Sequence, residues 1–109
     1  SNEAKMKYLG VRQETLDTFG AVSEETCREM VDGLIRETEA SAAIATTGIA
    51  GPDSAEGKPV GLVYIGVHAR GETSVFEHHF SGDRNWIRMR TTTAALDHIR
   101  KALLNYLEK

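Results

Sequence analysis

The segment with the clearest chemical potential is TTGIAGP at positions 46–52. It follows a short apolar run, and loops that leave strand ends are where α/β sheets tend to place ligands. Threonine hydroxyls can donate hydrogen bonds there, and glycines let backbone amides approach an anion closely. An ordinary strand-to-strand connection with a Gly-Pro turn is the alternative. The residues of this candidate site are Thr46, Thr47, Gly48, Ile49, Ala50 and Gly51.

Two arginines form a second candidate feature. Arg84 and Arg88 lie four residues apart in the first turns of an expected helix, so they share one face. Cations are disfavoured at a helix N-terminus, and a bound phosphate would compensate because guanidinium groups and free helix amides both favour it. A solvated charged face, balanced by Asp83 or other nearby acidic residues, explains the same pattern.

A general base and a nucleophile are harder to find in the sequence. Lys5 is the one candidate base, since burial beside a nucleophile would lower the pKa of its amine, although most lysines are simply exposed. None of the serines lies in a nucleophile-elbow pattern. Cys27 is interpreted as a packed helix residue.

The histidines do not predict a metal site. His78 and His79 are adjacent on an expected strand, so they point to opposite faces and cannot chelate one metal ion together. His68 and His98 add no ligand spacing. We interpret all four as structural or surface residues and expect no metal.

Hydrophobic spacing and capping residues predict the elements that would position these side chains. The long helix should start after Asp83, end near Leu107 and bury a stripe made of Ile87, Leu96, Ile99, Leu103 and Tyr106 or Leu107. Together the expected helices and strands predict an α/β fold, a three-layer α/β/α arrangement with a mixed sheet. The other expected elements are helices over 2–9, 13–19 and 23–40, and strands over 42–46, 60–69 and 72–80. Ser23 is the expected N-cap of the third of these helices, and the Arg70-Gly71 turn should join the last two strands as a hairpin.

Composition limits the class of protein. The 109 residues, 40% of them hydrophobic, suffice for one domain. A net charge of −3 without a basic stripe argues against direct nucleic acid binding. A single cysteine excludes a disulfide framework, and no apolar run approaches the roughly 18 residues of a membrane span. We therefore expect a cytoplasmic protein without membrane contact.

Four segments in this order resemble the CinA C-terminal domain family: SNEAKMKYLGV, AVSEETCREM, ATTGIAGPDSAEGKPVGLVYIGV and FSGDRNWIR. The resemblance covers nearly all of the chain. Stand-alone members of this family hydrolyse the carboxamide of nicotinamide mononucleotide to nicotinic acid mononucleotide and ammonia. The resemblance thus implies a small-molecule nucleotide substrate, a role in pyridine nucleotide salvage and no cofactor.

The resemblance also implies roles for individual residues. Lys5 would accept or orient a proton, Thr47 would belong to the loop around the reacting group, and Arg88 would contact the phosphate or the catalytic site. The nucleophile of the family is a serine in an SCTGG-like segment, which is not among these residues, so we expect a single domain over 1–109 that lacks its nucleophile-bearing N-terminal segment. The implied substrate-binding residues are Asn2, Thr46, Gly48, Ile49, Ala50, Gly51 and Arg84.

One departure from the family pattern and one alternative function remain open. After Pro52 the chain has Asp53-Ser54-Ala55-Glu56 in place of a glycine-rich continuation, and its two carboxylates would repel a phosphate unless they point outward. The alternative function is a non-catalytic nucleotide-binding or assembly module linked to competence or DNA damage. An exposed sheet edge would favour a homo-oligomer in either case.

Overall fold

The structure is a computed structural model that describes residue 3 and residues 9–107. Most of the helix expected over 2–9, including Asn2 and Lys5, therefore lies outside the described residues. None of the described helices is both long and apolar enough to cross a membrane. The elements are α2 (Gln13–Phe19), α3 (Glu24–Thr38), β1 (Ala42–Gly48), β2 (Leu62–Ala69), β3 (Glu72–His79) and α4 (Arg84–Leu107).

The three strands form one antiparallel sheet in the order β1-β2-β3. The expected mixed sheet is therefore wrong for the described residues. A parallel pair needs a long crossover connection, usually a helix, whereas both connections here are loops that return the chain beside the strand it has just left. The second connection is the two-residue turn Arg70-Gly71, in which both residues have positive φ, 59° and 80°.

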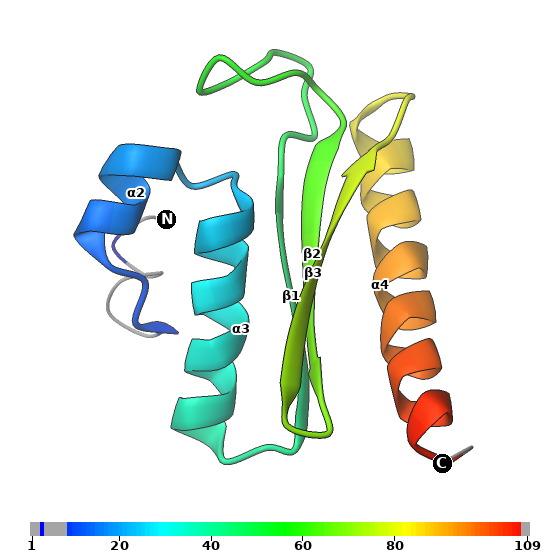
Figure 1. The fold of residues 1–109 in the computed structure, drawn as a ribbon. Coiled ribbons are helices and arrows are strands. Elements are labelled where there is room, and N and C mark those ends of the chain that lie inside the picture. The colour runs from blue at the N-terminus through cyan, green and yellow to red at the C-terminus, as the bar shows by residue number, and fades with distance from the viewer. Residues whose placement is uncertain (1–2, 4–8, 108–109) are drawn as a thin grey trace.

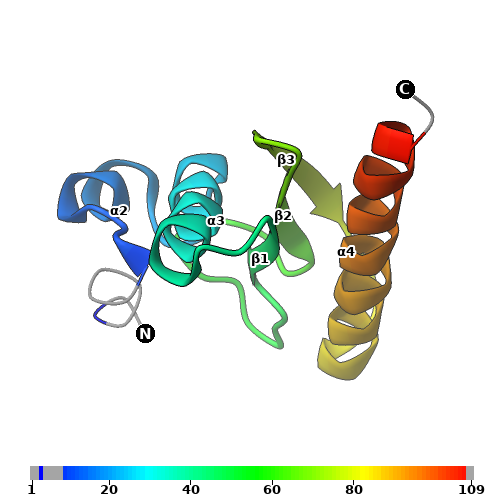
Figure 2. The same ribbon diagram turned by 90° about the horizontal axis from the view of Figure 1, so that it is seen from below.

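The expected three-layer arrangement is confirmed. Helix α3 covers one face of the sheet and α4 covers the other, with α2 packed outside α3 (Figures 1 and 2). The central strand β2 is buried on both sides, because Val63, Ile65 and Val67 pack toward α4 while Gly66 meets α3. A Cβ atom on Gly66 would lie 2.5 Å from a methyl carbon of Val31, so this glycine sets how closely α3 can approach.

Two capping predictions are confirmed. The side chain of Ser23 accepts a hydrogen bond from the amide of Thr26 at the start of α3. Asp83 Oδ1 accepts one from the amide of Trp86 at the start of α4. Because each cap satisfies a helix amide that would otherwise lack a partner, both helices start where the sequence predicts.

The expected apolar stripe of α4 is partly wrong. Ile87 is 2% exposed and Ile99 packs against the core, but Leu96 is 59% exposed and Leu103 is 44% exposed. An α-helix turns by about 100° per residue, so Leu96, nine positions after Ile87, lies half a turn away from it. Small residues such as Ala95 face the sheet instead. The side chains of Tyr106 and Leu107 lie outside the described part of the chain.

Candidate functional site

The end of β1 and the start of α4 enclose an open cavity of about 520 Å³. The two elements meet at the same end of the sheet (Figure 1). The structure thus brings together the loop and the two arginines that the sequence singled out separately, although they are more than thirty positions apart. The lining residues are Thr46, Thr47, Gly48, Ala50, Val63, Arg84, Ile87, Arg88, Thr91 and Thr92.

The two arginines differ in how much of their donor capacity is used. Arg84 donates a hydrogen bond of 3.1 Å to the carbonyl oxygen of Gly51, which ties the loop to α4. The side chain of Arg88 makes no hydrogen bond or ion pair with any residue that the structure describes. Its guanidinium therefore retains its full set of donors for a ligand in the cavity.

Thr91 and Thr92 also line the cavity, and sequence reasoning missed them. The signal was available, because residues four apart share a helix face and these threonines follow Ile87 and Arg88 by four positions. Their hydroxyls donate to the carbonyl oxygens of Ile87 and Arg88, at 2.8 and 3.1 Å. Because their protons are already donated, the threonine oxygens can only accept further hydrogen bonds. A sugar hydroxyl could donate such a bond to them.

The neighbouring threonines of β1 face opposite sides of the sheet. Thr46 is exposed and lines the cavity on the α4 side. Thr47 is 7% exposed, and its hydroxyl donates a 2.8 Å hydrogen bond to the carbonyl oxygen of Ala21 on the α3 side. The structure therefore places the backbone of Thr47 at the cavity and its hydroxyl away from Arg84 and Arg88.

The rest of the predicted loop serves the fold as well as the cavity. Ile49 is buried against Val22 and Leu62, and its amide donates to the carbonyl oxygen of Leu62. Gly48 is needed because a Cβ there would lie 2.8 Å from a methyl carbon of Val63. Gly51 has a φ of 87°, which favours glycine. Packing thus accounts for Ile49, whose side chain does not line the cavity.

Comparison with known proteins identifies the family. The sequence profile of the CinA C-terminal domain matches residues 1–103. This chain belongs to the CinA C-terminal domain family. It is 54% identical over 107 residues to a putative competence-damage inducible protein of Caldicellulosiruptor saccharolyticus, and 51% identical over 105 residues to a CinA-like protein of Kosmotoga olearia. These matches cover 97% and 95% of the chain but only 26% of each relative.

Solved structures show the same fold. The competence/damage inducible protein CihA of Agrobacterium tumefaciens superposes with a TM-score of 0.88 at 41% identity, covering 94% of this chain and 64% of that one. A CinA superfamily protein of Klebsiella pneumoniae gives a TM-score of 0.92 at 35% identity, with coverages of 96% and 66%. The chain thus spans about a quarter of its curated relatives and about two thirds of these solved chains.

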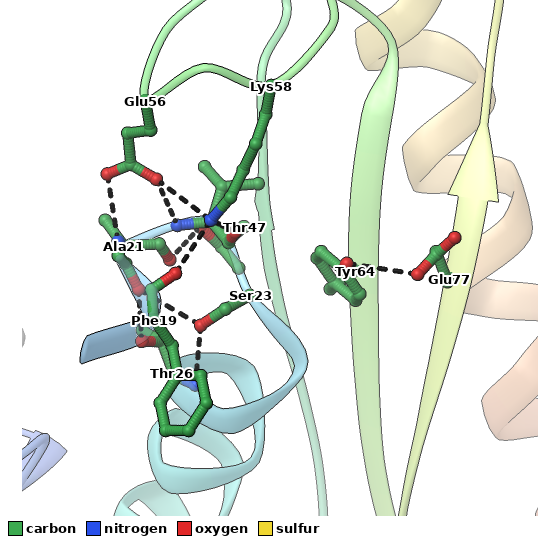
Figure 3. A network of polar contacts seen from close by, with 11 residues as sticks. Phe19, Ala21, Ser23, Thr26, Thr47, Glu56, Lys58, Tyr64 and Glu77 are labelled. Atoms are coloured by element: carbon green, nitrogen blue, oxygen red, sulfur yellow. Dashed lines mark hydrogen bonds and ion pairs between the residues drawn. The ribbon is translucent and has the colours of Figure 1, made fainter. Parts of the chain in front are cut away.

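In this CinA C-terminal domain the loop after Pro52 has a structural role. Glu56 accepts hydrogen bonds from the amides of Ala21 and Val22, at 2.9 and 3.0 Å (Figure 3). Lys58 donates to the carbonyl oxygens of Phe19 and Val22. These contacts fasten the loop to the α2–α3 connection, so the Glu56 carboxylate faces the α3 side and not the arginines.

The same contacts set the charge state of Glu56. Burial by itself raises the pKa of this carboxyl. The hydrogen bonds from the Val22 and Ala21 amides, together with the charge and hydrogen bond of Lys58, outweigh burial and lower the pKa below its ordinary value of 4.5. Glu56 is therefore ionised at neutral pH while it holds the loop.

The remaining chemically interesting side chains of the domain lie elsewhere. Burial raises the pKa of the Cys27 thiol to about 12, which makes it a poor nucleophile. His78 and His98 meet at 2.8 Å, a contact between β3 and α4 that sequence spacing did not indicate. In the described part of the chain, no three histidine, cysteine, aspartate or glutamate residues form a group that could hold a metal ion.

Proposed function

We propose that this CinA C-terminal domain forms the nucleotide-binding part of an amidohydrolase site for nicotinamide mononucleotide. The reaction converts the nucleotide and water to nicotinic acid mononucleotide and ammonia. The observation that carries the proposal is the guanidinium of Arg88, which has no partner among the described residues and lies in an open cavity that Arg84 and the glycine loop also line. An arginine without a partner in a cavity is well suited to a phosphate.

The lining of the cavity supports a nucleotide over a simple anion. Arg88 offers donors to a phosphate, while Thr91 and Thr92 offer acceptors, because their own hydroxyl protons are already donated to the helix backbone. A ribose hydroxyl is a donor that such acceptors can bind. The exposed hydroxyl of Thr46 can both donate and accept a hydrogen bond.

The proposed chemistry is acyl transfer. A serine oxygen attacks the carboxamide carbon, and the carboxamide nitrogen leaves as ammonia. Water then hydrolyses the serine ester and releases the acid. By the resemblance, that serine would belong to an SCTGG-like segment, which is not among these 109 residues. Lys5, which lies outside the described residues, would accept or orient the proton. Thr47 would act by holding the loop in place, since its hydroxyl donates a hydrogen bond to the carbonyl oxygen of Ala21.

The second candidate function is a nucleotide-binding or assembly module without turnover. It rests on the same cavity, because a site that lacks a nucleophile can still bind the nucleotide. The unpaired outer edge of β1, within the part of the chain that the structure describes, offers a place where further chain or a second copy can pair.

Ammonia release separates the two functions. We would compare the 109-residue chain with a chain extended by the serine-containing segment of a relative, using nicotinamide mononucleotide as substrate. The amidohydrolase proposal expects release only from the extended chain, and loss of that release in its Lys5→Ala variant. Binding without release by a folded extended chain would favour the binding module.

A further inference from the structure

Two histidine rings from different elements converge on the α4 side of the sheet. His78 belongs to β3 and His98 to α4, and their Nε2 atoms lie 2.8 Å apart. This pair is separate from the cavity, because His98 lies ten residues beyond Arg88, or about 15 Å along the helix. Nothing in the proposed amidohydrolase chemistry uses it.

Aromatic stacking fixes both rings in place. Phe76 stacks on His98 with ring centroids 3.8 Å apart and planes within 6°. Phe80 stacks on His78 at 5.0 Å and 12°. Each imidazole is therefore held with its Nε2 toward the other by a phenyl ring, and both histidines remain half-buried, within reach of solvent.

The surroundings of both rings favour the uncharged imidazole over the imidazolium ion. Burial lowers the pKa of both imidazoles, and the charge of His79 on His78, and of His78 and Lys101 on His98, lowers them further. Asp97 opposes this for His98, but its carboxylate is already paired with Arg100 and Lys101. An unprotonated nitrogen of a neutral imidazole is a common metal ligand.

We propose that His78 and His98 bind a single transition-metal ion of the zinc, nickel or copper class through their Nε2 atoms. At a zinc–nitrogen distance of about 2.0–2.1 Å, tetrahedral geometry separates two nitrogens by about 3.4 Å, so the rings need to part by only about half an ångström. Water completes the coordination. The ring that donates its Nε2 proton in this contact takes its other neutral tautomer, with the proton on Nδ1, and its Nε2 then becomes the second ligand. The ion joins β3 to α4.

The chemistry of the pair also selects the ion. Imidazole suits zinc, nickel and copper, whereas magnesium and calcium prefer oxygen ligands. With two protein ligands and open positions the site is expected to bind in a reversible, pH-dependent way. Protonation of either ring removes a ligand, so binding weakens as the pH falls below the range in which both rings are neutral.

Calorimetry on the untagged 109-residue chain tests the proposal. Titration with zinc chloride and with nickel chloride should show one ion per chain, and magnesium chloride should show none. His78→Gln and His98→Gln should each weaken binding at least about tenfold. His68→Gln is the matched control, because this ring contacts Thr73, which donates to Asp32 of α3 on the other face of the sheet, and binding should be unchanged.

A second measurement does not depend on the variants. In the unmodified chain, zinc should shift the imidazole proton resonances of His78 and His98 together and leave those of His68 and His79 in place. Absence of binding, resonance shifts at other histidines, or undiminished binding in folded His78→Gln would overturn the site. The pair would then be a hydrogen bond between elements and nothing more.

Discussion

At the scale of single residues, strand alternation decides which hydroxyl can meet a ligand. The sequence alone does not distinguish Thr46 from Thr47. Ile44, two positions before Thr46, packs on the α4 side. Ala45, two positions before Thr47, packs on the α3 side. The side chains therefore separate. Sequence reasoning found the loop but could not choose the face, because both sides of this sheet are covered.

Valine substitutions test this division. Thr47→Val should lower the free energy of unfolding by about 1–2 kcal/mol, because the Ala21 carbonyl loses its hydrogen bond in a partly buried place. Thr46→Val should change it by less than about 0.5 kcal/mol, because Thr46 is exposed. Urea unfolding of the two variants measures both values. Equal losses would contradict the assignment of opposite faces.

Glu56 gives a prediction that depends on pH. Its pKa is lower in the folded chain than the ordinary 4.5, so the ionised form stabilises the fold above that value and this contribution is lost as the pH falls through the folded pKa. Glu56→Gln should therefore cost at most about 1 kcal/mol near pH 7, a modest figure because the residue is solvent-exposed. Urea midpoints of variant and parent should converge in acid. A constant difference down to pH 3 would argue against the ionised contact.

At the scale of elements, caps and turns were predictable and the orientation of α4 was not. Ser23, Asp83 and the Arg70-Gly71 turn act through neighbouring backbone atoms, which the sequence states directly. The buried face of α4 depends on what the sheet presents. Leucines lie on the outer face of this helix while alanines lie on the inner one, so hydrophobicity alone selected the wrong residues.

Two substitutions in α4 separate its faces. Ile87→Ala should lower the free energy of unfolding by about 2–4 kcal/mol, because it opens a cavity between α4 and β2. Leu96→Gln should leave it within about 0.5 kcal/mol in the 109-residue chain, because that side chain is mostly exposed. Thermal or urea unfolding provides the values. A large loss for Leu96→Gln would show that another surface covers it.

The packing of α3 on the sheet rests on one glycine. Gly66→Ala should destabilise the chain by about 1–3 kcal/mol, because its methyl group would meet Val31 and the sulfur of Cys27. Ser74→Ala, an exposed change on the neighbouring strand, is the control and should have little effect. Circular dichroism during urea unfolding measures both. Equal stability of the two variants would mean that α3 can shift away at no cost.

At the scale of the whole molecule, the sequence predicted the layers, the family and the hairpin of β2 and β3, but not the direction of β1. Three short apolar runs with flanking helices fit either a mixed or an antiparallel sheet, and the choice depends on whether each connection crosses a face or returns along an edge. The long loop after β1 returns, because Glu56 and Lys58 hold it against the α2–α3 connection. Contacts between positions so far apart leave no periodic signal in the sequence.

The central claim is that the cavity between β1 and α4 binds a nucleotide phosphate through Arg88. The most direct measurement is calorimetric titration of nicotinamide mononucleotide into the chain, its Arg88→Ala variant and an Arg90→Ala control, whose guanidinium lies over the Trp86 ring instead of in the cavity. We predict binding by the parent and the control, with an affinity at least about tenfold lower for Arg88→Ala. Equal affinities for all three, or a loss confined to Arg90→Ala, would contradict the account.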